Sequence, residues 1–161
     1  MIEPFTIYHL LFTIYSTPSS LEVLMVHIDT EHLTVMMEAG YVYLGMRRFK
    51  EARQLFEGLC VLAPDSDVPL VALGNVDFCE NRLAQAVKRY EQALDVDPQS
   101  VYAKVYMGEA LLFAGEKEKG AKLLKDVAKA DKGGAGQFAT ALLDAVKQGF
   151  EPRPPKAKGK R

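Results

Sequence analysis

A spacing of 34 residues recurs through the middle of this chain of 161 residues. At that spacing, chemically similar residues coincide at four positions. The equivalent sets are Gly40, Gly74 and Gly108; Ala52, Ala86 and Gly120; Phe56, Tyr90 and Leu124; and Pro64 with Pro98. Agreement at several positions in one register indicates repeated structural units, each of which needs a neighbour to bury its apolar face.

The repeated residues resemble the tetratricopeptide pattern, which has a large residue, Leu-Gly, an aromatic residue, Ala, a second aromatic residue and a closing Pro. Three repeats follow one another, over Leu33 to Ser66, Asp67 to Ser100 and Val101 to Gly134. The third departs from the pattern, with Lys104 at the large position and Lys132 at the Pro position. We interpret it as a degenerate terminal repeat.

Apolar residues within each repeat recur at helical spacing. The sequence therefore predicts an all-α fold, in which each repeat supplies two antiparallel helices. The first helices are expected at about 34–45, 68–79 and 102–113, and the second helices at about 49–61, 83–95 and 117–130. Arg47-Arg48, Asn81-Arg82 and Gly115 mark the turns within the repeats.

The two ends of the chain fall outside the repeat register. Residues 1–32 are expected to form an N-terminal helical extension, with an apolar helix over Phe5 to Tyr15 and a capping-box start at Ser19 to Glu22. Its apolar residues must pack on the first repeat or on a second copy of the chain. A glycine-rich run at 133–136 breaks the array. Residues 135–150 then supply a capping helix, expected over 137–148, that covers the last repeat.

Composition favours one ordinary globular domain, with 48% apolar and 25% charged residues. The net charge is -1, and the last ten residues carry five cations and no acid, so the remaining 151 residues sum to -6. An acidic body of this kind does not favour nucleic-acid binding. We interpret residues 151–161 as a solvated, disordered basic tail, with an electrostatic tether to an acidic partner as the alternative.

The cysteine content and the N-terminal segment bear on the compartment. Cys60 and Cys79 fall on predicted apolar helix faces and do not indicate a disulfide framework, which fits a reducing compartment. The apolar stretch Phe5 to Tyr15 is too short to span a bilayer and lacks the features of a signal peptide. The sequence thus predicts a cytoplasmic protein.

Asp77 stands where the repeat pattern usually has an aromatic residue. Burying an unpaired carboxylate costs several kcal/mol, roughly. Its side chain is therefore expected to reach solvent or a partner.

Similarity to tetratricopeptide proteins implies that repeat positions 2, 5, 9, 12 and 13 of each first helix line a concave groove. Eleven of these fifteen residues are apolar or aromatic, and contiguous exposed apolar patches mark interaction sites. The candidate binding residues are Met37, Tyr41, Leu44, Val71, Asn75, Phe78, Tyr102, Val105, Glu109 and Leu112.

Within this set, Tyr41, Phe78 and Tyr102 are the expected aromatic anchors, and Asn75 and Glu109 the expected hydrogen-bonding groups for a peptide backbone. The alternative is that some of these residues are partly buried core, or that the N-terminal helix of the same chain fills the groove. Tetratricopeptide domains that clamp the acidic C-terminus of heat-shock chaperones have Lys and Asn where this chain has Met37 and Tyr41. A carboxylate clamp is not expected.

The stretch Phe56 to Gly74 resembles the tetratricopeptide chaperones of bacterial type III secretion, in particular those of the hydrophobic translocator subunits. This resemblance implies a cytoplasmic, non-enzymatic chaperone that holds an apolar segment of its secretion substrate in the groove before export. It also implies a homodimer through the N-terminal helices. Two alternatives remain open: a scaffold or adaptor that joins soluble protein partners, and a chaperone of the needle subunit.

No catalytic constellation is found in the sequence, and no cofactor or metal is expected. His27 and Glu31 are four residues apart on a predicted helix, but no third metal ligand accompanies them. The segment Gly115 to Lys122 lacks the Gly-Lys-Ser/Thr ending of a phosphate loop and follows a helix instead of a strand. These observations favour a binding protein over an enzyme.

Overall fold

The computed structural model of this protein describes residues 29–152. The chain divides into two units, Met1–Thr30 and Glu31–Arg161, and only Asp29 and Thr30 of the first unit are described. The described residues form seven α-helices: α2 (Thr30–Gly45), α3 (Phe49–Leu62), α4 (Val68–Cys79), α5 (Leu83–Val96), α6 (Val101–Phe113), α7 (Lys117–Ala130) and α8 (Gly134–Lys147).

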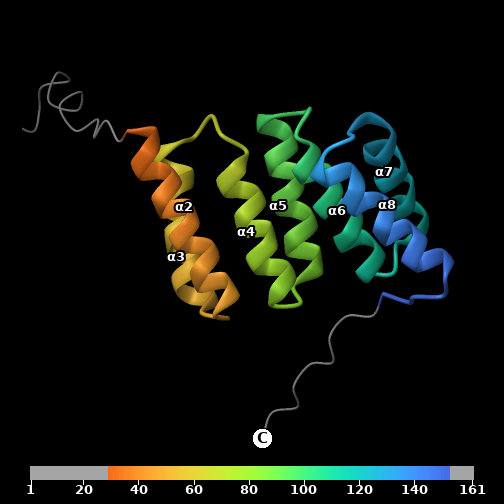
Figure 1. The fold of residues 1–161 in the computed structure, drawn as a ribbon. Helices are drawn as coiled ribbons and strands as arrows, with labels where there is room; N and C mark the ends of the chain where they lie inside the picture. Colours follow the sequence, from red (N-terminus) through yellow and green to blue (C-terminus); the bar gives the residue numbers. More distant parts are fainter. Residues whose placement is uncertain (1–28, 153–161) are drawn as a thin grey trace, which may run out of the picture. The chain divides into compact units, whose positions relative to one another are not determined.

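The helices follow one another in space in the order of the sequence, as Figure 1 shows for α2 to α8. The pairs α2–α3, α4–α5 and α6–α7 correspond to the three predicted repeats, and α8 packs on both α6 and α7. This arrangement confirms the predicted all-α tetratricopeptide fold. The observed bounds differ from the predicted ones mainly at α2, which begins at Thr30.

The same backbone turn joins the two helices of every repeat. Arg47, Asn81 and Gly115 have positive φ angles of 59°, 62° and 90°. The residue after each donates its N–H to the carbonyl five residues earlier, as from Arg48 to Tyr43 at 2.9 Å. This is the Schellman ending of a helix, in which one left-handed residue turns the chain. The turns predicted from the sequence are therefore confirmed.

A glycine in each first helix lies directly against a large side chain of the following helix. A Cβ atom built on Gly40 would lie 2.3 Å from the Phe56 ring, and one on Gly74 would lie 2.3 Å from the Tyr90 ring. Because no real Cβ atom makes so short a contact, only glycine lets the two helices of a repeat approach this closely. The third repeat has the same contact between Gly108 and Leu124, at 2.8 Å.

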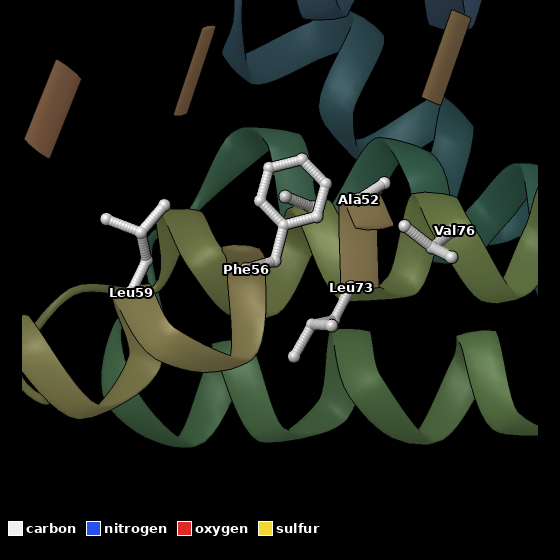
Figure 2. Close-up of a cluster of buried hydrophobic side chains, with 6 residues drawn as sticks. Ala52, Phe56, Leu59, Leu73 and Val76 are labelled. Carbon is white, nitrogen blue, oxygen red and sulfur yellow. The ribbon is translucent and has the colours of Figure 1, made fainter. Parts of the chain in front are cut away.

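The core continues across the boundaries between repeats. In Figure 2, Ala52, Phe56 and Leu59 of α3 form one cluster with Leu73 and Val76 of α4. Two further clusters join the second repeat to the third and the third to α8. Each repeat thus buries its apolar face on the next one.

The glycine-rich run at 133–136 starts α8 instead of separating it from the array, so the predicted start at residue 137 is wrong. The carboxylate of Asp131 accepts hydrogen bonds from the N–H groups of Gly133 at 3.1 Å and Gly136 at 2.7 Å. A Cβ atom on Gly136 would lie 1.9 Å from the Asp131 carbonyl oxygen. Glycine at position 136 therefore lets the first turn of α8 lie close to the carbonyl group of Asp131.

Several predictions concern residues outside the described part of the chain. They are the two helices and the homodimer contact within 1–28, and the basic tail beyond Pro152.

Of the two cysteines, Cys60 is half-buried and Cys79 is exposed. Cys79 therefore does not have the buried environment that its predicted apolar helix face suggested.

Asp77 is 2% exposed and is held by arginines of its own chain. Arg53 of α3 contacts its Oδ1 at 2.8 Å, and Arg82, in the turn before α5, contacts the same atom at 2.8 Å. Both arginines also pair with Glu80. Burial raises the pKa of the Asp77 carboxyl from its ordinary value, and the positive charges of Arg53 and Arg89 oppose this rise. The expected partner of Asp77 is thus internal, and it connects the first repeat to the second.

We expect Asp77→Ala to lower the free energy of unfolding by about 2 to 3 kcal/mol, because it leaves partly buried guanidinium groups with one carboxylate fewer. Urea denaturation measures this change. The matched control is Asp95→Ala, which removes an exposed carboxylate of α5 and should change the stability by no more than about 0.5 kcal/mol. Equal effects of the two substitutions would contradict a structural role for the Asp77 cluster.

Candidate functional site

A pocket of ≈ 280 Å³ lies between the first helices of the three repeats. Its walls are mostly apolar and aromatic and come from α2, α4, α6 and the loop before α4. The lining residues are Tyr41, Asp67, Val68, Val71, Tyr102 and Tyr106. We call this cavity the inner pocket. Three of its large side chains are well exposed: Tyr41 at 41%, Val68 at 49% and Tyr102 at 54%.

Two tyrosines one helical turn apart form the α6 wall of the inner pocket. The rings of Tyr102 and Tyr106 are stacked, with centroids 6.3 Å apart. Tyr106 also lies against Tyr90 of α5 and Phe138 of α8, with both centroid distances 6.2 Å. The sequence analysis did not select Tyr106. Its spacing of four residues from Tyr102 is the signal that could have identified it.

A row of three polar side chains runs across the first helices beside the inner pocket. Tyr41, Asn75 and Glu109 are 34 residues apart and therefore occupy the same position in their repeats. The hydroxyl of Tyr90 donates a hydrogen bond to Oδ1 of Asn75 at 2.8 Å. Burial raises the pKa of Tyr41, and the Asn75 side chain partly opposes this rise. We call Tyr41, Asn75 and Glu109 the polar row.

Glu109 is the charged member of the polar row. Burial raises the pKa of its carboxyl from 4.5 to about 7. Glu109 in turn raises the pKa values of Tyr90 and Tyr106, and it also raises that of the Cys79 thiol. Near neutral pH, Glu109 therefore changes its charge beside the tyrosine side chains of this surface.

A second aromatic group lies at the C-terminal ends of α4 and α6. The rings of Phe78 and Phe113 are 5.3 Å apart in an edge-to-face arrangement, and Phe150 lies 6.4 Å from Phe113. Such pairs of rings stabilise each other beyond the area they bury. The side chain of Phe78 is half-buried, so only part of it is available to a partner.

Six of the ten predicted site residues lie in the inner pocket, the polar row or the second aromatic group. Tyr41, Val71 and Tyr102 line the inner pocket, and Asn75 and Glu109 belong to the polar row next to it. Phe78 lies in the second aromatic group.

The other four predicted site residues contribute mainly to the core. Val105 and Leu112 are each 1% exposed and pack with Ala135 and Ala139 of α8. Their expected place on a groove wall is wrong, because they are buried among residues of α7 and the capping helix. Met37 and Leu44 are half-buried against the cluster around Phe56.

No group of three or more His, Cys, Asp or Glu residues between 29 and 152 could hold a metal ion. In the same part of the chain, no helix has both the length and the apolar character required to cross a membrane.

Comparisons with known proteins agree with the fold. The tetratricopeptide repeat family model matches residues 79–144. No curated protein matches the chain. Among solved structures, the type III secretion translocator chaperone SycD of Yersinia enterocolitica is 20% identical, with a TM-score of 0.65, and the match covers 76% of this chain and 97% of SycD.

Two further structures were solved with peptides or binding regions of other proteins. PcrH in complex with the chaperone binding region of PopD is 18% identical, with a TM-score of 0.62 and coverage of 75% of this chain and 95% of that chain. The first tetratricopeptide domain of Spaghetti (RPAP3), bound to an HSP90 peptide, is 19% identical, with a TM-score of 0.64 and coverage of 77% and 97%. The chain thus has the tetratricopeptide repeat fold, and this fold is similar to that of the translocator chaperones.

The raised pKa of Glu109 predicts a dependence of stability on pH. Because the folded state binds this proton more tightly than the unfolded state, the contribution of Glu109 to the free energy of unfolding is full below about pH 4.5 and is lost as the pH rises through about 7. We expect Glu109→Gln to remove this loss and to stabilise the protein at about pH 8 by on the order of 1 to 2 kcal/mol.

Urea denaturation at about pH 5 and about pH 8 tests this expectation. Glu91→Gln on the exposed side of α5 is the control and should leave the pH dependence of wild type unchanged. A Glu109→Gln variant with the same pH dependence as wild type would show that Glu109 is solvated as an ordinary surface carboxylate.

Proposed function

We propose that this protein is a cytoplasmic peptide-binding chaperone that holds an extended, apolar segment of a type III secretion substrate against its first helices before export. The substrate would be a hydrophobic subunit of the translocator kind. In this proposal the protein performs no chemical reaction, and binding shields apolar surface of the substrate from aggregation.

The inner pocket is the observation that carries the proposal. It is a mostly apolar cavity that stays open in the folded chain, although its walls are aromatic residues that usually bury their rings. Exposed apolar surface bordered by polar groups marks interaction sites, and aromatic side chains in such pockets contribute a large share of binding energy. The polar row beside the pocket offers side chains that can fix the register of a bound segment.

The secretion role rests on the resemblance to SycD and PcrH. The PcrH structure contains the chaperone binding region of PopD, and a SycD structure contains a peptide of the translocator YopD. The present chain covers nearly the whole length of both proteins. We infer the same class of substrate for this chain from that likeness in fold, together with the apolar lining of its own pocket.

A homodimer through the N-terminal helices remains part of the proposal. The exposed apolar side chains of Val35 and Val42 lie seven residues apart along α2, which places them on one face of the helix, and the exposed Met46 follows directly after its end. This face is available to the N-terminal extension of the same chain or to that of a second copy.

The alternative is a tetratricopeptide adaptor that joins soluble proteins and has no export role. Such an adaptor would bind a charged or folded partner. The basic, arginine-lined pocket between α3 and α5, which contains Arg53, Arg82 and Arg89, is the feature that favours this alternative. The two functions differ in which face of the protein the partner occupies.

The test is a selection of random peptides, displayed on phage, against the immobilised full-length protein. Peptides of roughly twelve residues are long enough to cross three helices spaced about 9 Å apart. We expect apolar and aromatic residues to be enriched among the selected peptides. The double variant Tyr41→Ala with Phe78→Ala should lower the affinity for a selected peptide by about a hundredfold, because it removes two aromatic anchors.

The control is Val61→Ala, which truncates a side chain of α3 that is 79% exposed and does not line the inner pocket. It should leave affinity unchanged. Circular dichroism of the double variant should show wild-type helicity and a loss of stability of about 1 to 2 kcal/mol. Selection of acidic or hydrophilic peptides that the double variant still binds would favour the adaptor.

A further inference from the structure

The carboxyl group of Glu109 has no partner of opposite charge in the described chain. Its charge adds to the rise that burial causes in the pKa values of Cys79 from α4, Tyr90 from α5 and Tyr106 from its own helix, and the nearby cation Arg47 acts on Cys79 in the opposite direction. Between residues 29 and 152, no ion pair or hydrogen bond engages the Glu109 carboxyl. By contrast, Asp77, which is more deeply buried than Glu109, is held by two arginines.

The charge at the inner pocket is negative, as is that of the Glu109 carboxylate. Its single charged lining residue is Asp67, which is half-exposed at the mouth of the pocket beside Val68. The side of the first helices that holds the pocket and the polar row therefore presents two acids, and no cation lines the pocket. A carboxylate that is partly withdrawn from water without a partner is costly, and a partner molecule can remove that cost by supplying a cation.

We propose that the segment bound at the inner pocket presents a lysine or arginine side chain to Glu109. This inference rests on the proposed function, because it specifies the chemistry of the segment that the pocket holds. Hydrogen bonds between a cation and a carboxylate are shorter and stronger than neutral ones. The methylene stem of the incoming side chain would lie along the ring of Tyr106, as the stems of lysine and arginine do on apolar surfaces.

The positions on α6 fix where that basic residue falls in the bound segment. Tyr102, which lines the inner pocket, and Glu109 are seven residues apart on one helix, so they are separated by about 10 Å along its axis. An extended chain advances about 3.3 Å per residue. Where the bound segment follows α6 between these two positions, the basic residue is therefore expected three or four residues from the apolar residue that fills the pocket.

The experiment compares peptide selections on two full-length proteins, wild type and Glu109→Gln. The wild-type selection should yield apolar peptides with one enriched lysine or arginine at a constant spacing of about three or four residues from an apolar anchor. The Glu109→Gln selection should yield apolar peptides without this enrichment. Glu91→Gln is the matched control and should select the same peptides as wild type.

A selected peptide then serves as the probe for affinity measurements by fluorescence anisotropy. Replacing its basic residue by norleucine should weaken binding to wild type by about tenfold or more and leave binding to Glu109→Gln nearly unchanged. Affinity of wild type for the basic peptide should increase as the pH rises through about 7, because Glu109 becomes charged while the lysine or arginine stays protonated. The Glu109→Gln variant should show no such increase.

The outcomes separate this inference from the proposed function. Apolar peptides without a preferred basic residue, selected equally by wild type and Glu109→Gln, would overturn the inference and leave the chaperone proposal in place. A failure to select apolar peptides at all would overturn both. If changing the five cations between Arg153 and Arg161 to glutamine strengthens peptide binding through Glu109, the cation comes from the chain's own tail, and the inference is wrong as stated.

Discussion

The close contact between a glycine of each first helix and a large side chain of the next helix is the constraint on which the rest of the structure depends. Phe56 and Tyr90 occupy the space in which a Cβ atom on Gly40 or Gly74 would lie. This contact fixes the rotation of the first helix about its own axis. The residue after each glycine is turned by about 100°, which brings Tyr41, Asn75 and Glu109 to the face beside the inner pocket. The position of the polar row is thus a consequence of how each repeat closes.

The third repeat shows what changes when this contact is altered. Leu124 replaces the aromatic residue, and Gly120 replaces the alanine that the other two repeats have at its position. A Cβ atom on Gly120 would lie 2.7 Å from the Gly108 carbonyl oxygen, so the backbones of these two helices come close together at this point. Helices α7 and α8 pack on α6 and bury Val105 and Leu112. Of the predicted groove residues on α6, Tyr102 and Glu109 therefore stay outside the core, and Tyr106 lies between them.

Much of this architecture can be predicted from the sequence, because equivalent residues make the same contacts in each of the three 34-residue repeats. The helix pairs, their turns at Arg47, Asn81 and Gly115, and the need of Asp77 for a partner are all predictable from residue type and spacing. The start of α8 is not, since it depends on the Asp131 carboxylate satisfying backbone N–H groups within a glycine-rich run.

The burial of Val105 and Leu112 likewise depends on a helix that belongs to no repeat. Glu109 is identifiable as a polar residue from the sequence, but its partial burial depends on how the neighbouring helices pack around it. Residue spacing within one helix cannot reveal such a contact between elements.

The most direct measurement of the central claim is a nuclear magnetic resonance titration of the full-length, isotope-labelled protein with an apolar peptide taken from the selection. If an extended segment binds against the first helices, the largest shift changes will come from the amides around Tyr41, Val71 and Tyr102. Changes confined to α3 and α5, around Arg53 and Arg89, would contradict the account and place the binding surface on the opposite set of helices.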